Sequence, residues 1–324
     1  MGKCLIIVRS GKDSLHETWL KGWTPDLGWD LVCANFGGAS HRGTLGQTID
    51  TSAYLTKQVF VNHLLDSGGN DIGVDLDQYD YLWFPDDDIL MDTASVSTFF
   101  QWCARTGADL SQPSLGEGSY ITHPVTCKHQ NSDFRNTTFI EVMAPCFSRT
   151  AWRILVAADR FRTLSGWGVE LFWTHLLNPL IHPFFVFDAV SVVHTRQVGG
   201  PFYPWMPQGL SADQEARTEL DRHCIEKSLG WFRCSISLSF ANNLLRYDSP
   251  GFIDNILNGI GYAYRRPGDK LRGIAYLQSN SVPDTPINHI PVRIFGHATF
   301  ADYLMAQVNV SEWVQYFSER RCKL

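Results

Sequence analysis

The sequence predicts an α/β protein built on a mostly parallel sheet flanked by helices. Short apolar runs bounded by turn residues, of which Cys4 to Val8 is the first, have the length and composition of buried strands. Between residues 4 and 106 these runs alternate with helical stretches, an order typical of a parallel sheet wound with helices. The 324 residues, 44% apolar and 19% charged, are enough to bury the core of such a domain.

Turn and capping residues delimit the predicted elements of the first 177 residues. Strands are expected at 4–8, 29–36, 81–84 and 137–143, with extended pieces at 110–113 and 120–124 and a polar loop at 127–136. Helices are expected from Asp13-Ser14 to 19 and at 51–65, 94–106, 147–158 and 170–177.

The remainder of the chain begins with strands at 184–189 and 191–194 and then becomes mainly helical. Ser211 to Gln214 has the form of a capping box and begins a helix that Gly230 is expected to end. Further helices are expected at 250–264, 298–308 and 311–317. We therefore expect two regions, 1–205 and 206–324.

Composition narrows the function classes. The formal net charge of −6 argues against a nucleic-acid binder, whose surface would be basic. No run of 18 apolar residues is present, and the apolar block at the N-terminus is too short for a signal peptide. The eight cysteines contain no Cys-x-x-Cys pair, which fits reduced thiols in a cytoplasmic protein.

Three consecutive carboxylates, Asp86, Asp87 and Asp88, follow the predicted strand 81–84. In open α/β sheets, ligands bind beyond the carboxyl ends of the strands. Because neighbouring carboxylates repel one another, the triplet predicts a compensating positive charge, most simply a divalent cation with oxygen ligands. A solvated acidic turn is the alternative, since charged side chains usually lie at the surface.

Two further residues are candidates for chemistry. Glu170 follows the tight turn Gly166-Trp167-Gly168 and lies in the first turn of a predicted helix, whose dipole favours the ionised carboxylate that a general base needs. It could equally be an ordinary first-turn acid. His194 ends a predicted strand, where it could ligate a metal or form a structural hydrogen bond.

Other catalytic templates do not fit. The sequence has no phosphate-binding loop that ends in Gly-Lys-Ser/Thr, no Gly-x-Ser-x-Gly elbow and no His-Glu-x-x-His. Asp86-x-Asp88 resembles the acid pair of aspartate-nucleophile phosphatases, but Leu90 stands where those enzymes have Thr or Val.

Five groups of motifs occur in a characteristic order. They are Tyr79-Asp80-Tyr81-Leu82-Trp83 with Asp86-Asp87-Asp88, Leu110-Ser111-Gln112-Pro113, Phe139-Ile140-Glu141-Val142-Met143-Ala144-Pro145 with Phe147-Ser148-Arg149 and Trp152, Gly166-Trp167-Gly168-Val169-Glu170, and Val192-Val193-His194. Together they resemble a family catalogued as domain of unknown function 707, which is itself similar to glycosyltransferases of the GT-A fold. The resemblance implies a GT-A-like, Rossmann-like mixed sheet with a mainly helical C-terminal extension.

The resemblance also implies roles at the acid triplet. Asp86-Asp87-Asp88 would be the Asp-x-Asp motif, and Asp88 would bind a Mn²⁺ or Mg²⁺ that bridges the diphosphate of a nucleotide sugar. Asp86 would join this metal group or contact the ribose or a metal-bound water. His194 matches a position that often supplies a further metal ligand.

Further roles follow from the same resemblance. Gly166 to Glu170 is similar to the Gly-Trp-Gly-Gly-Glu-Asp stretch of β-1,4-galactosyltransferases, so Glu170 would deprotonate the acceptor hydroxyl. Leu171 stands where that motif has its second carboxylate. The positions expected to contact the donor are Val8, Arg9, Ser10, Asp86, Asp87, Trp167 and Gly168. Trp167, Trp83 and Trp173 could stack on sugar or uracil, although we expect at least two of them in the core.

These implications define one leading hypothesis and two alternatives. The leading one is a metal-dependent, inverting glycosyltransferase with residues 1–205 as the nucleotide-sugar-binding and catalytic domain. The donor would be a nucleotide sugar and the acceptor a hydroxyl of a glycan or a lipid-linked glycan. The alternatives are a metal-dependent phosphohydrolase or nucleotidyltransferase, and a non-catalytic glycan-binding protein with a GT-A core. Residues 206–324 could form an acceptor-side lid, a homodimer contact or a surface at the inner face of a membrane.

Overall fold

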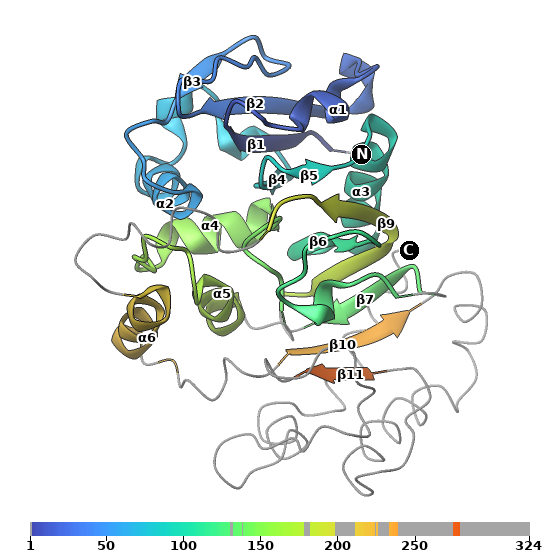
Figure 1. The fold of residues 1–324 in the computed structure, drawn as a ribbon, viewed down its shortest axis with the longest axis vertical. Coiled ribbons are helices and arrows are strands. Elements are labelled where there is room, and N and C mark those ends of the chain that lie inside the picture. Colours follow the sequence, from blue (N-terminus) through green and yellow to red (C-terminus); the bar gives the residue numbers. More distant parts are fainter. Residues whose placement is uncertain are drawn as a thin grey trace, which may run out of the picture.

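The computed structural model describes residues 2–129, 132–137, 139–177, 182–197, 211–223, 225, 233–238 and 275–278. Within these ranges the chain forms one mixed sheet with helices on both faces (Figure 1). The predicted α/β class, with a mixed sheet flanked by helices, is confirmed.

The described elements have the following bounds. The strands are β1 (Cys4–Ser10), β2 (Trp29–Asn35), β3 (Thr48–Asp50), β4 (Tyr81–Trp83), β5 (Ile89–Leu90), β6 (Leu110–Leu115), β7 (Phe134–Thr137), β8 (Cys146–Ser148), β9 (Phe184–His194), β10 (Arg233–Leu238) and β11 (Ala275–Gln278). The α-helices are α1 (His16–Leu20), α2 (Lys57–Ser67), α3 (Thr93–Thr106), α4 (Arg149–Ala157), α5 (Val169–Leu177) and α6 (Ala212–Arg222).

The sheet runs in the order β11-β10-β7-β9-β6-β8-β4-β1-β2-β3, and β5 pairs with β9 outside this path. Strand β1 lies between β2 and β4 and is parallel to both, so the carboxyl ends of these three strands meet at one edge. β3 is parallel to β2 and β6 to β9, whereas the other described pairs are antiparallel. Beyond β7, β10 and β11 extend the sheet.

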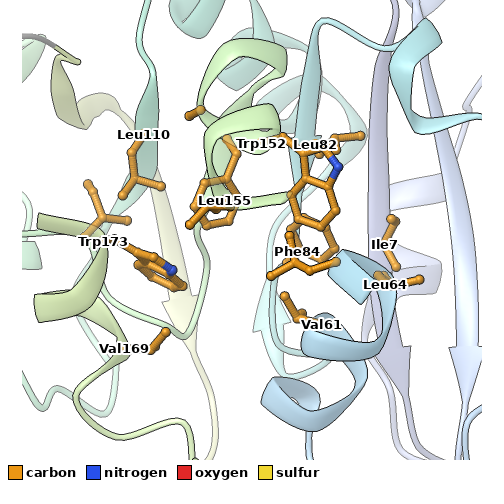
Figure 2. Packing of buried hydrophobic residues seen from close by; sticks show 14 of the residues in the cluster. Ile7, Val61, Leu64, Leu82, Phe84, Leu110, Trp152, Leu155, Val169 and Trp173 are labelled. Carbon is orange, nitrogen blue, oxygen red and sulfur yellow. The ribbon is translucent and has the colours of Figure 1, made fainter. Parts of the chain in front are cut away.

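Strand β1 is buried on both faces, which explains its continuous apolar sequence. Leu5 and Ile7 belong to a core cluster with α2, α4 and α5. Cys4, Ile6 and Val8 point to the opposite face, into a cluster with α1 and α3. Figure 2 shows the first of these layers, where side chains of α2, β4 and α4 meet. The two layers hold the carboxyl edge of the sheet in place.

Local capping explains where several helices begin. The predicted helix 51–65 begins only at Lys57, because the Thr56 hydroxyl accepts a hydrogen bond from the Val59 N–H and caps the helix there. Ser148 caps α4 as expected, and Ser211 with Gln214 forms the predicted capping box. The α6 helix ends at Arg222, earlier than predicted.

The strand predicted at 137–143 is wrong. The strand is instead β7, which begins inside the segment predicted as a polar loop, and residues 139–143 belong to no strand. Their backbone donors bind side chains rather than a neighbouring strand: Gln112 Oε1 accepts from the Glu141 N–H at 2.6 Å, and Glu170 Oε1 accepts from the Val142 N–H at 3.3 Å. The single β9 also replaces the two strands predicted at 184–189 and 191–194.

Predictions for much of the C-terminal region concern residues outside the described ones. The domain boundary near residue 205 and the helices expected at 250–264, 298–308 and 311–317 lie there. Among the residues that are described, no helix combines the length and the apolar character needed to cross a bilayer.

Candidate active site

The acid triplet lies at the edge of the sheet where β1, β2 and β4 end. Asp86, Asp87 and Asp88 follow β4 after Phe84 and Pro85, and the short strand β5 comes directly after them. Antiparallel pairing of β5 with β9 places Ile89 opposite His194, which brings the last strand end next to the acids. Two hydrogen bonds from Thr195 to the Asp88 carbonyl, of 3.1 Å and 2.8 Å, fix this arrangement.

Asp86, Asp88 and His194 form a group that could hold a metal ion. One ligand atom from each lies within 4.8 Å of the other two. The His194 Nε2 is 3.2 Å from Asp88 Oδ2, and both side chains are only 9% exposed. Asp88 Oδ1 is buried and has no hydrogen-bond partner among the described residues. A buried carboxylate oxygen without a partner is costly, and a cation would satisfy it. The residues present therefore fit a divalent metal.

His194 is oriented as a metal ligand requires. Its Nδ1 lies 2.9 Å from the Tyr120 carbonyl, which can only accept, so Nδ1 donates and Nε2 is directed at Asp88. Burial lowers the pKa of His194, but the hydrogen bond with Asp88 and its negative charge outweigh burial and raise the pKa to about 9. Without a metal, the protonated imidazole therefore neutralises Asp88.

Asp87 has a structural role that differs from that of its neighbours. Its Oδ2 accepts a hydrogen bond from the Gly11 N–H at 2.7 Å, and its Oδ1 accepts one from Arg196 at 3.0 Å. A Cβ on Gly11 would lie 2.8 Å from the Phe36 ring, so a larger residue there would have to displace this ring. Asp87 thus holds the loop after β1 and the end of β9 against the acids.

Cations surround the triplet, and sequence reasoning did not identify two of them. Lys57, at the start of α2, forms an ion pair with Asp86 Oδ1, and Arg196 pairs with Asp87. Arg9 lies 4.1 Å from the centre of the Phe36 ring. Burial lowers the pKa of Arg9, and the nearby charges of Asp87 and Asp86 act in the opposite direction. Lys57 lies 29 positions from Asp86 with no motif around it, whereas Arg196 is two positions after His194.

The other donor-contact residues predicted on β1 are buried beneath this edge. Val8 is part of the core, and Ser10 donates a hydrogen bond to Asn35 Oδ1 at 3.0 Å. Only the backbone of Val8 is thus left for a ligand contact. Arg9, by contrast, donates a hydrogen bond to the Tyr54 carbonyl and lies close enough to Asp87 and Asp86 for their charges to act on its pKa.

Glu170 lies in the first turn of α5 and is connected to the acid loop through one backbone segment. Its carboxylate is buried and accepts from the Val142 N–H. The next residue, Met143, accepts hydrogen bonds at its carbonyl from the Asp86 N–H at 2.7 Å and from Lys57 at 3.0 Å. A second buried carboxylate, Glu141, precedes this segment and lies 4.0 Å from His123. The structure thus brings Glu170 to the same segment that holds Asp86.

The loop before Glu170 is held by α6. Glu215 accepts hydrogen bonds from the N–H groups of Leu164 and Ser165, at 2.5 Å and 3.0 Å. Gly168 has a φ of +84°, and a Cβ there would lie 3.1 Å from the Cβ of Ala216. Trp167, between the two glycines, is 43% exposed.

The other two tryptophans considered for stacking lie in the core. Trp83 is fully buried, and its indole N–H donates to the Ala144 carbonyl at 3.0 Å. Trp173 packs edge-on against Phe147, with ring centres 5.2 Å apart. Of the three, Trp167 alone is exposed enough to contact a sugar or a base.

Comparison with known proteins supports the resemblance seen in the sequence. Residues 74–223 match the model of a family described as "Protein of unknown function (DUF707)", so the resemblance is confirmed over these residues. The match contains the acid triplet, Glu170 and His194. No curated protein sequence matches the chain.

Two solved structures are similar at low identity. One is A197 from STIV, at 12% identity and a TM-score of 0.33, with 60% of this chain and 85% of that chain covered. The other is S. aureus TarS 1–349 in complex with UDP-GlcNAc, at 12% identity and a TM-score of 0.35, with 81% of this chain and 80% of that chain covered.

Proposed function

We propose that this chain is a metal-dependent, inverting glycosyltransferase that uses a nucleotide-sugar donor. The observation that carries the proposal is the group of Asp86, Asp88 and His194, in which a buried carboxylate oxygen of Asp88 has no partner within the part of the chain that the structure describes. The family match over residues 74–223 includes all three residues.

The type of ligand atom favours Mn²⁺ or Mg²⁺. Carboxylate oxygens suit both ions, and an imidazole nitrogen is a better ligand for Mn²⁺ than for the harder Mg²⁺. The site contains two carboxylates and one imidazole. We therefore expect Mn²⁺ to support the activity better than Mg²⁺.

The charge balance favours an anionic second ligand. Once His194 is neutral, as metal ligation requires, the charges of the three carboxylates are balanced by those of three nearby cations among the described residues, Lys57, Arg196 and Arg9. A divalent cation would leave an excess of two positive charges, which a diphosphate would neutralise. The excess positive charge therefore favours a nucleoside diphosphate as the leaving group.

The reaction is a single displacement at the anomeric carbon. The oxygen of the acceptor hydroxyl forms the new bond, the bond from the anomeric carbon to the diphosphate oxygen breaks, and the nucleoside diphosphate leaves. Glu170 accepts the hydroxyl proton, a contribution of about 10²–10⁴-fold for a well-placed base. A divalent ion bound by Asp86, Asp88 and His194 would stabilise the negative charge on the leaving group.

Several finer features belong to the same proposal. The acceptor is a hydroxyl of a glycan or a lipid-linked glycan, and the protein acts in the cytoplasm, where nucleotide sugars would be available to it. A peripheral membrane surface and a homodimer remain predictions for residues 206–324.

A thermal-shift screen of nucleotide sugars with Mn²⁺, followed by product analysis, tests this function. We expect one donor to raise the melting temperature only with metal present. Transfer should stop with excess EDTA and in Asp88→Ala, whereas Asp26→Ala, which removes an exposed acid, should remain active.

Other outcomes identify the alternatives. Full activity of Asp88→Ala, or full activity in EDTA, would contradict the metal role. Free sugar phosphate or inorganic phosphate as the main product would indicate a phosphohydrolase. No shift with any donor would favour a non-catalytic protein.

A further inference from the structure

Lys57 uses its three ammonium hydrogens on the acid loop and on the segment that contacts Glu170. Its Nζ forms a hydrogen-bonded ion pair with Asp86 Oδ1 and donates to the Met143 carbonyl at 3.0 Å and the Phe84 carbonyl at 3.3 Å. The lysine side chain is only 15% exposed. A lysine placed so close to a metal group has to be compatible with the bound cation.

The ammonium and a divalent cation would compete for the same carboxylate. The ligand atom of Asp86 lies within 4.8 Å of those of Asp88 and His194, and Lys57 contacts Asp86 directly. Two positive groups this close repel each other, by about 1–2 kcal/mol at 5 Å even in water. Metal binding therefore favours a state in which Asp86 turns toward the metal and Lys57 finds another anion.

The nearest suitable anion is the diphosphate of the proposed donor. Lysine binds phosphate as a point charge and has a flexible stem that lets the ammonium move. The side chain of Asp86 is 39% exposed, so the pair lies at the open side of the group, in contrast to the 9% of Asp88. A diphosphate that bridges to the metal would therefore lie within reach of Lys57.

Lys57 also connects the group of possible metal ligands to the part of the site that contains Glu170, the proposed base. The preceding residue, Thr56, donates a hydrogen bond to the Leu164 carbonyl in the loop before Glu170. Lys57 itself donates a hydrogen bond to the Met143 carbonyl, and the preceding residue, Val142, donates its N–H to Glu170. A change of partner by Lys57 would alter both sides of the site together.

We propose that Lys57 exchanges partners during the reaction cycle. In the empty site it neutralises Asp86, and in the loaded site it binds the diphosphate and stabilises its charge as it leaves. This inference rests on the proposed function and deepens it, because it assigns to Lys57 the recognition of a nucleoside diphosphate.

Calorimetry on charge-removing and charge-keeping variants tests the exchange. Lys57→Met and Lys57→Gln remove the charge, Lys57→Arg keeps it, and Lys21→Met is a control at an exposed lysine. Titrations measure the affinity for Mn²⁺ alone and then for UDP and GDP in saturating Mn²⁺. We expect both charge-removing variants to bind Mn²⁺ about tenfold more tightly and the diphosphate at least about tenfold more weakly. Lys57→Arg and Lys21→Met should stay near the wild type.

The results separate failure of this inference from failure of the function. If the wild type binds a diphosphate and the charge-removing variants bind it equally well, the partner exchange is wrong and the function stands. Weaker Mn²⁺ binding in these variants would contradict the competition for Asp86. If the wild type binds Mn²⁺ but none of the diphosphates, the proposed function fails, and the inference that rests on it fails as well.

Discussion

The protonation state of His194 makes metal binding depend on pH in a defined direction. The pKa of His194 is raised to about 9, because the bond with Asp88 outweighs the effect of burial. A metal binds only the neutral imidazole, so binding must displace the Nε2 proton. Below the pKa, the apparent affinity should therefore rise about tenfold for each pH unit. At pH 7, the apparent affinity for the metal should therefore be about 100-fold lower than that of the deprotonated site, which corresponds to about 2.7 kcal/mol of binding free energy.

Titration calorimetry with Mn²⁺ between pH 6.5 and 8.5 measures this effect. Buffers with different ionisation enthalpies report the number of protons released, which we expect to be about one at pH 7. His194→Gln should remove most of the pH dependence, whereas His63→Gln, at a partly exposed histidine paired with Asp71, should retain it. An affinity that stays constant over this range, with no proton released, would refute the reasoning.

Three further predictions concern the base, the loop and the core. Glu170→Gln should bind the donor like the wild type but lose transfer by about 10²-fold or more, and a fully active variant would exclude Glu170 as the base. Gly168→Ala should lower the free energy of unfolding by about 1–3 kcal/mol, more than Gly22→Ala, because both have positive φ but only Gly168 contacts α6. Equal losses in denaturant titrations would contradict that packing. Arg135→Met should lower the free energy of unfolding by about 3–5 kcal/mol, because it leaves the fully buried carboxylate of Asp188 without its bidentate partner.

The strands that sequence reasoning identified correctly are those whose burial is visible locally. Cys4 to Val8 and Phe184 to Phe187 are continuous apolar runs, as strands covered on both faces must be. Strand β7 was missed because it contains Arg135, whose charge is compensated by Asp188, 53 positions away. No local pattern contains that information.

The same distinction applies to the site. Asp86 and Asp88 could be predicted because they follow a recognisable strand, and His194 because it ends another. Lys57, the cation beside Asp86, could not be predicted in this way. It comes from a helix N-terminus and meets Asp86 only through the packing of α2 on the sheet. The contact of Glu170 with the Val142 N–H likewise depends on residues 139–143 leaving the predicted strand.

Electron–nuclear double resonance on the Mn²⁺-loaded protein with a nucleoside diphosphate tests the central claim most directly. The account predicts a ³¹P coupling from the diphosphate and a ¹⁴N coupling from His194 on the same Mn²⁺ ion. In His194→Gln the ¹⁴N coupling should disappear while bound metal still shows the ³¹P coupling. A wild-type spectrum of bound Mn²⁺ that shows neither the ³¹P nor the ¹⁴N coupling would contradict a metal and diphosphate site at Asp86, Asp88 and His194. A ¹⁴N coupling that persists in His194→Gln would contradict it as well.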